Sequence, residues 1–137
     1  MLFRSLVMPP LIEYLESLLT GTGEDLDLQT FKVTDQHSGR TMGVRADMTP
    51  QVARIEAHFL RADMPVRLCY IGSTLLARAP SVGASREPLQ FGAELFGSAD
   101  PRADGEILAL MARSLRLVGV EEIHIDIGHV EIGRAHV

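Results

Sequence analysis

Four polar side chains stand at spacings that suit recognition of a small charged molecule. Asp47 and Thr49 are two residues apart, directly before an apolar pattern of helical spacing, and can converge on one cavity. Gln90 and Glu94 are four apart, and this even separation puts both on one face of a strand. An amide and a carboxylate that project together can bind an amine or an imidazole through charge-assisted hydrogen bonds. These four residues form the candidate site.

Each member of the candidate site also has a plain structural explanation. Thr49 can cap the helix that follows it, and Asp47 can accept backbone hydrogen bonds in the preceding turn. Gln90 and Glu94 can form a solvent-facing polar stripe on their strand. Spacing alone favours these structural explanations over a ligand site.

Two arginines stand near the candidate site in the sequence. Arg45 precedes Asp47 by two residues, and Arg86 precedes Gln90 by four. Either guanidinium can hold an anion or support the site, and either can instead pair with a surface carboxylate, which stabilises a protein little.

No metal site is predicted. His124, Asp126 and His129 are the nearest approach to one, but His129 has the opposite strand parity and a third ligand is not evident.

Composition excludes several classes of protein. The chain has 137 residues, of which 46% are hydrophobic and 23% charged, so it is one ordinary globular domain. Its net charge of −5 argues against binding nucleic acid by charge. No apolar run is long enough to span a bilayer, and a secretory signal is missing. The single cysteine excludes an internal disulfide and is typical of a reducing compartment, so we expect a cytoplasmic protein.

The elements expected to position the site are helices alternating with paired strands. Apolar spacing predicts helices over 11–19 with Pro10 in the first turn, over 49–60 with Pro50 at the first position, and over about 104–118 ending at Gly119. Strands are predicted at 6–8, 31–35, 41–45, 66–76, 89–96 and 123–127. Turn residues at 37–40 predict a hairpin, and prolines, glycine and serines make 77–88 a loop. The order indicates an α+β fold, an antiparallel sheet flanked by helices.

The two ends of the chain are expected to be foreign to the gene. Residues 132–137 match one reading frame of a common short-read sequencing adapter, and residues 1–5 match its reverse complement. The alternative is that both ends are genuine coding sequence. Under the adapter interpretation the natural insert is near 6–131, a gene fragment cut at both ends.

Three segments together resemble a known family. The run Arg45–Arg54, followed by Arg86–Glu94, resembles the regulatory subunit of ATP phosphoribosyltransferase, a paralogue of histidyl-tRNA synthetase with the class II synthetase catalytic fold. Pro10–Glu13 resembles the proline-containing first class II motif, which belongs to the dimer interface. Tyr70–Glu94 resembles the second motif, two strands joined by a loop. The resemblance spans Leu6 to about Val130 and implies a partial class II core, roughly the first third of a family member.

The same resemblance separates a regulator from a working synthetase. A synthetase uses an arginine of the second motif to neutralise charge that grows on the α-phosphate of ATP. Aligned without gaps, this arginine falls on Leu76 and the motif's glutamate falls on Arg78. Leucine donates no hydrogen bond, and Arg78 lies two residues further on. The resemblance therefore implies that the activation chemistry is lost and that the chain is not itself an enzyme.

The amino-acid pocket of the synthetase is better preserved. Asp47, Thr49 and Gln90 match positions that hold the α-amino group of histidine, and Glu94 matches the residue that faces the imidazole. Asp47 is shorter than the glutamate of the synthetase. The resemblance implies a fold that has kept part of a histidine site, and histidine can then act by shifting an equilibrium between states of a complex.

Family knowledge supplies the expected partners. The regulatory subunit assembles with the short-form catalytic subunit of ATP phosphoribosyltransferase, in the first step of histidine biosynthesis and its feedback inhibition by histidine. Homodimer contacts are expected through the Pro10 region, and no cofactor, membrane or nucleic acid is expected. A divergent histidyl-tRNA synthetase core is the alternative function. A third possibility is that the fragment alone binds nothing, because missing strands leave sheet edges and apolar surface uncovered.

Overall fold

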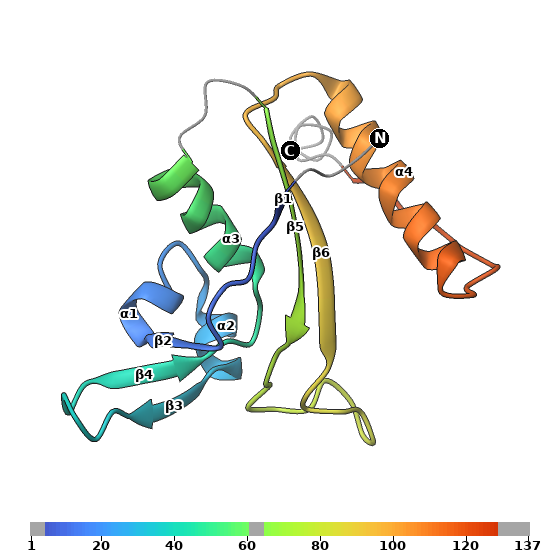
Figure 1. Cartoon of the computed structure of the whole chain (residues 1–137). Helices are drawn as coiled ribbons and strands as arrows, with labels where there is room; N and C mark the ends of the chain where they lie inside the picture. Colours follow the sequence, from blue (N-terminus) through green and yellow to red (C-terminus); the bar gives the residue numbers. More distant parts are fainter. Residues whose placement is uncertain (1–4, 61–64, 129–137) are drawn as a thin grey trace, which may run out of the picture. The chain divides into compact units, whose positions relative to one another are not determined.

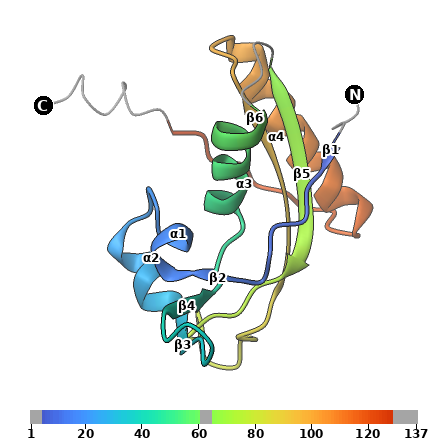
Figure 2. The ribbon, with the colours of Figure 1, turned by 60° about the vertical axis from the view of Figure 1, so that its left-hand side comes forward.

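The computed structural model describes residues 5–60 and 65–128. The expected adapter segments lie outside these residues except for Ser5. The chain divides into two compact units, residues 1–99 and residues 100–137, and the candidate site lies wholly in the first. This unit holds two three-stranded sheets, one of them covered by a helix that follows Asp47 (Figures 1 and 2).

The first sheet carries half of the candidate site. Its strands are β1 (Ser5–Leu6), β5 (Val66–Ser73) and β6 (Leu89–Phe96), in the order β1-β5-β6. β5 and β6 pair antiparallel along their whole length, with Tyr70 opposite Gly92, as the sequence predicts for two strands around the 77–88 loop. β1 instead pairs parallel to β5, so the sheet is mixed rather than purely antiparallel.

The second sheet confirms the predicted hairpin and adds a strand. β3 (Phe31–Thr34) and β4 (Thr41–Val44) are antiparallel, and Asp35 closes their turn by accepting hydrogen bonds from the backbone N–H groups of His37 and Ser38. β2 (Ile12–Tyr14) pairs antiparallel with β4 on its other side. The single sheet expected from the sequence is thus two sheets, within a fold of the predicted α+β class.

The helix predicted over 11–19 is wrong in its first half. Only α1 (Leu15–Leu18) is helical, and a second short helix, α2 (Glu24–Gln29), follows it. The residues before α1 are extended because β4 offers them a ladder of backbone hydrogen bonds, and Leu11 O also accepts from Arg45 N at 3.0 Å. Apolar spacing over nine residues cannot distinguish this arrangement from a helix, since strand pairing depends on a partner distant in sequence.

The helix that covers the first sheet is α3 (Thr49–Ile55), which continues as a π-helical turn, Glu56–Leu60. Pro50 stands in its first turn as predicted, but Met48 rather than Thr49 occupies the N-cap position and no side chain caps the helix. Apolar side chains of α3 and its N-cap pack on β5 and form the core of this unit. The fully or nearly buried members of this core are Met48, Val52, Leu68 and Tyr70.

The second unit is built on α4 (Pro101–Leu117). The Asp100 carboxylate accepts a hydrogen bond from Arg102 N at 2.9 Å and caps the helix, and Gly119, with φ of +90°, ends it as the sequence predicts. The strand predicted over 123–127 does not form, and described residues 121–128 are irregular. Alternating isoleucines favour a strand only where another strand completes its hydrogen bonds, and none in the described part of the chain does so.

Candidate functional site

A hydrogen-bonded clamp joins the entrance of α3 to strand β6. Asp47 Oδ1 accepts from Thr49 N at 3.0 Å and from Gln90 Nε2 at 2.6 Å. The amide oxygen of Gln90 in turn accepts from Met48 N at 2.9 Å. Asp47 therefore is the turn acceptor that the structural explanation predicts, and it also binds Gln90, which the sequence places on a different element. The amide oxygen and the amide nitrogen of Gln90 are therefore both hydrogen-bonded within the clamp.

A second chain of hydrogen bonds passes through Tyr70. Its hydroxyl donates to Glu94 Oε1 at 3.1 Å and lies 2.9 Å from Thr49 Oγ1. Because the hydroxyl has only one proton and gives it to the carboxylate, Thr49 is the donor in the second contact. Thr49 thus bonds to Tyr70 with its side chain and to Asp47 with its backbone. The four candidate residues and Tyr70 form one connected group, which we call the polar network.

Tyr70 is the member of the polar network that sequence reasoning missed. It lies in β5 on the same face as buried Leu68, which marks it as a core side chain. The available signal was its cross-strand partner, because Tyr70 faces Gly92, midway between Gln90 and Glu94. A Cβ at Gly92 would stand 2.4 Å from both Cζ and the hydroxyl of Tyr70, so only glycine leaves room for the ring to cross β6.

The polar network has a definite charge pattern. Burial raises the pKa of Tyr70 to about 12, against the opposing effect of the Thr49 hydrogen bond, and the nearby Glu94 charge raises it further. Tyr70 therefore keeps its proton at neutral pH. In the described part of the chain, Asp47 Oδ2 and Glu94 Oε2 accept no hydrogen bond. The network thus offers two carboxylate oxygens to a ligand that brings donors or positive charge.

An open groove of about 450 Å³ exposes part of this network. Asp47 and Thr49 both line it. The turn after α1 contributes Thr20 and Gly21, and α3 with its π-helical continuation contributes further residues. These are Pro50, Ala53, Arg54, Ala57 and His58. Gln90 and Glu94 are not among the residues that line the groove, but hydrogen bonds connect them to Asp47 and, through Tyr70, to Thr49.

Two polar side chains of α3 tie the helix to the segment that contains β2. Arg54 Nη2 contacts both carboxylate oxygens of Glu13 at 2.5 Å, with the two side chains only 22% and 16% exposed. Gln51, which is 1% exposed, donates to Pro10 O at 2.8 Å and to Glu13 Oε2 at 3.0 Å. These contacts fix the position of α3, and hence of Asp47 and Thr49 at its entrance.

Both flanking arginines donate hydrogen bonds to backbone carbonyls. Arg45 is 7% exposed and donates to Ser73 O at 2.9 Å and to Pro9 O at 2.5 Å, which ties the end of β5 to the start of the second sheet. Burial lowers its pKa. Arg86 is exposed, and donates to the carbonyls of Leu76 and Ala77 at 2.9 Å each. Of the two predicted roles, anion binding or support, the contacts of both guanidinium groups are those of support.

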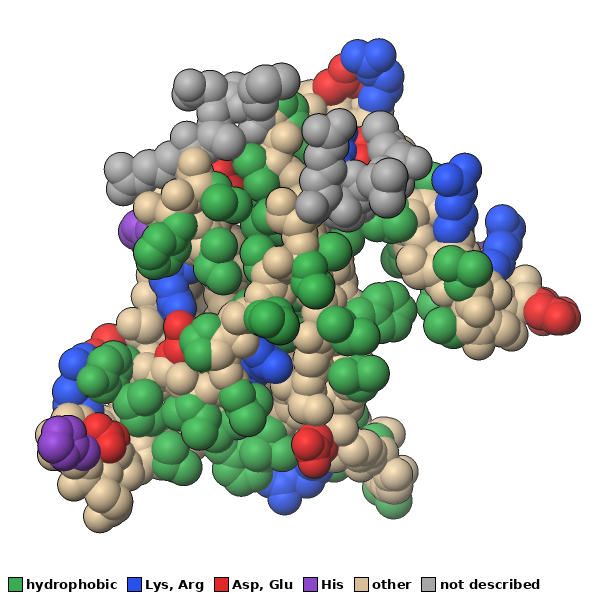
Figure 3. Space-filling view, viewed as in Figure 1, with side chains coloured by type: hydrophobic (Ala, Val, Ile, Leu, Met, Phe, Trp, Pro, Cys, Tyr) green, Lys and Arg blue, Asp and Glu red, His purple; other side chains and the backbone are tan. Residues whose placement is uncertain are grey.

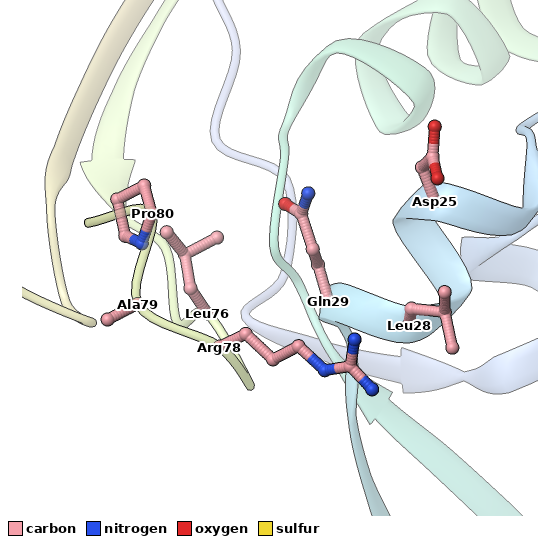
Figure 4. A pocket seen from close by; sticks show the side chains of 7 residues that line it. All are labelled: Asp25, Leu28, Gln29, Leu76, Arg78, Ala79 and Pro80. Carbon is pink, nitrogen blue, oxygen red and sulfur yellow. The ribbon is translucent and has the colours of Figure 1, made fainter. Parts of the chain in front are cut away.

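The start of the loop between β5 and β6 is attached to the end of α2 by backbone contacts. Leu76 pairs with Thr30 in an isolated bridge, and Ala77 N donates to Gln29 O at 2.7 Å, so the loop is attached to the end of α2. A separate pocket of about 180 Å³ lies there. Leu76 and Arg78 line it, and the Arg78 side chain extends toward α2 (Figure 4).

The described residues contain no group of three or more His, Cys, Asp or Glu side chains arranged to hold a metal ion. His124 and Asp126 are 91% and 96% exposed, and His129 lies outside the described residues. None of the helices found in residues 5–60 and 65–128 has the length and apolarity needed to cross a bilayer.

Comparison with known proteins gives concordant results. The family model described as histidyl-tRNA synthetase matches residues 5–137. The chain is 64% identical over 129 residues to the ATP phosphoribosyltransferase regulatory subunit of Alkalilimnicola ehrlichii, and 61% identical over 130 residues to that of Thioalkalivibrio sulfidiphilus. These alignments cover 94% and 95% of this chain but 32% and 33% of the relatives, so the chain spans about a third of their length.

Solved structures show the same relationship in three dimensions. A protein from Bacillus halodurans, described as an ATP phosphoribosyltransferase regulatory subunit/histidyl-tRNA synthetase, superposes with a TM-score of 0.74 at 35% identity, covering 86% of this chain and 30% of that one. A histidine–tRNA ligase subunit from Alicyclobacillus acidocaldarius gives a TM-score of 0.66 at 25% identity, with 84% and 32% covered. The neighbours thus carry both names, regulator and ligase.

Proposed function

Because the chain belongs to the histidyl-tRNA synthetase family, we propose that it is part of a regulatory subunit of ATP phosphoribosyltransferase with no catalytic activity of its own. In this proposal the complete subunit binds histidine and transmits its presence to a separate catalytic subunit. The observation that carries the proposal is a contrast between two regions. In the polar network the carboxylates and the amide are connected by hydrogen bonds and leave acceptors for an amino acid. The loop has Leu76 at the position where a synthetase needs a cation.

The chemistry of the polar network favours histidine as the ligand. Free histidine carries an α-ammonium group and an imidazole, both of which donate hydrogen bonds to carboxylates. Asp47 and Glu94 each hold one carboxylate oxygen in the network and leave the other available within the described residues. We assign the ammonium group to Asp47 and Thr49, with Gln90 holding the Asp47 carboxylate from β6, and the imidazole to Glu94. This assignment needs no reaction, because a carboxylate attracts a cation whether or not ATP is present.

Loss of ATP chemistry is supported by the loop. Amino-acid activation places developing negative charge on a phosphate, and stabilising that charge takes a donor or a cation. Leu76 offers neither. Arg78, two residues after Leu76, is the nearest cationic residue in the loop sequence, and it lines the pocket beside α2. Backbone hydrogen bonds attach the start of the loop to α2.

Calorimetric titration tests the regulatory proposal. Histidine is added to the complete protein that contains this chain, first alone and then in the presence of the short-form catalytic subunit of ATP phosphoribosyltransferase. We expect heat of binding that changes between the two titrations, since an effector acts through its different affinities for two states. Absence of heat in both titrations contradicts the proposal.

A divergent histidyl-tRNA synthetase core is the second candidate function. The matching family model and the Alicyclobacillus ligase subunit favour it. It requires histidine-dependent exchange of pyrophosphate with ATP, a reaction that the regulatory proposal excludes.

The proposal also includes a homodimer through the segment around Pro10. Hydrophobic side chains gather over β2 and its neighbours on the face in Figure 3. In and just before β2, Met8, Leu11 and Ile12 are 83%, 47% and 46% exposed, and a cluster of exposed apolar side chains can mark a protein interface. Light scattering of the complete protein with Ile12→Lys should show a smaller particle than wild type, and an unchanged mass contradicts this contact.

A further inference from the structure

Tyr70, which packs over Gly92, carries a hydroxyl group that packing of the core does not require. A phenylalanine would fill the same volume between Leu68 and Met48, yet the side chain carries a hydroxyl that reaches two polar partners. The ring crosses β6 at the one position without a side chain, and ends beside Glu94. The contact is diagonal across the two strands, because Glu94 itself lies opposite Leu68.

From this geometry we infer that Tyr70 is a positioning residue, which turns Glu94 so that its second carboxylate oxygen meets the imidazole of a bound histidine. The inference rests on the proposed histidine site and goes beyond it by naming the residue that holds the imidazole-binding carboxylate. Tyr70 touches Glu94 and Thr49, and acts on the ligand only through them.

The direction of the hydrogen bonds explains how Tyr70 acts. Thr49 donates to the Tyr70 oxygen, and Tyr70 donates to Glu94 Oε1. A donor aimed at a carboxylate favours its charged form and fixes one of its oxygens. The Glu94 side chain has three rotatable bonds, and without this contact it must be ordered by the ligand itself, at a cost in affinity. The same tyrosine also links Glu94 to Thr49, so the imidazole and ammonium ends of the site are set at a fixed separation.

The test compares histidine affinity in variants of the complete protein by calorimetry. Tyr70→Phe keeps the ring in the core and removes only the hydroxyl, and we expect roughly tenfold weaker binding. Tyr14→Phe is the matched control, because this other tyrosine of the chain stands on β2, away from the polar network, and should bind as wild type does.

A double-mutant cycle separates positioning from general damage to the fold. If Tyr70 acts through Glu94, Tyr70→Phe weakens binding in the wild-type background and has no further effect when combined with Glu94→Ala. A loss of equal size in both backgrounds, or none in either, overturns the inference. Where Glu94→Ala binds too weakly to measure, Glu94→Asp replaces it in the cycle, and the same two outcomes decide.

The outcomes also separate this inference from the function on which it rests. A wild type that gives no heat with histidine overturns the proposed site, and the role assigned to Tyr70 with it. A wild type that binds, with Tyr70→Phe binding equally well, overturns only the role of Tyr70.

Discussion

Two regions of the same unit carry polar side chains but use them differently. In the polar network, Asp47 and Thr49 at the entrance of α3 are joined to two residues of β6. Asp47 bonds directly to Gln90, and Thr49 is linked to Glu94 through Tyr70. In the loop between β5 and β6, Arg86 donates hydrogen bonds to backbone carbonyls, and the Arg78 side chain extends toward α2. The network leaves two carboxylate oxygens available to a ligand, whereas the loop directs its donors to its own backbone. We therefore propose that a histidine site persists next to a loop that does not support phosphate chemistry.

The largest effect is expected from Glu94→Gln. This change keeps the acceptor for Tyr70 and removes the negative charge that faces the ligand, so histidine should bind between roughly tenfold and a hundredfold more weakly. Glu87→Gln in the loop is the matched control, because Glu87 is exposed and outside the network. Calorimetry on the complete protein measures both. Equal affinities for the two variants would show that the network and the loop do not differ as described.

Glycine substitutions in the two regions should separate stability from binding. Gly92→Ala places a methyl group 2.4 Å from the Tyr70 ring, and should cost about 1–3 kcal/mol of stability and weaken histidine binding. Gly83→Ala in the loop meets no neighbour within 4 Å but must adopt a φ of +82°, which costs about 1–2 kcal/mol. Thermal unfolding should therefore reveal a loss in both variants, and calorimetry a loss of binding in Gly92→Ala alone. A binding defect in Gly83→Ala contradicts the separation.

Tyr70 should make the stability of the network depend on alkaline pH. Its pKa is raised to about 12 by burial, above the value of about 10 for an exposed tyrosine. A raised pKa means that its contribution is complete below pH of about 10 and is lost as pH rises through about 12, because the unfolded state releases the proton first. Melting temperatures across this interval should fall more steeply for wild type than for Tyr70→Phe. Parallel curves for the two proteins would contradict the burial of this hydroxyl.

The smallest effect is expected from Arg78→Ala. The side chain is exposed and makes no ion pair or hydrogen bond with any described residue, so stability should change by less than about 0.5 kcal/mol. Histidine affinity should also stay at the wild-type value, because Asp47 and Thr49 line a different groove. Thermal unfolding and calorimetry check both statements. Weaker histidine binding in this variant would bring the loop into the binding site.

The sequence predicted those elements that local chemistry determines. The hairpin at 35–40 is marked by its turn residues, and the antiparallel pair of β5 and β6 by two apolar runs around a proline-rich loop. The end of α4 is marked by Gly119. Strand β2 was missed because its partner, β4, lies some thirty residues away and leaves no local mark on Ile12–Tyr14. The isoleucines over 123–127 show the converse, since their alternation finds no partner strand among the described residues.

The four candidate residues were named from the sequence, but the hydrogen bonds that connect them were not predicted. Gln90 bonds directly to Asp47, and Glu94 is linked to Thr49 through Tyr70. Thr49 was expected to cap α3 but bonds to Tyr70 instead, because the tyrosine hydroxyl reaches it from β5. Tyr70 escaped notice because the space it needs is created by Gly92, and a missing side chain gains meaning only once the strand register is known.

The contrast between the two regions is tested most directly by histidine-dependent exchange of pyrophosphate with ATP, measured on the complete protein. The proposed histidine site beside a loop with Leu76 predicts that histidine binds and that exchange stays at the background rate. Robust exchange that requires histidine would contradict this and would identify the protein as a working ligase.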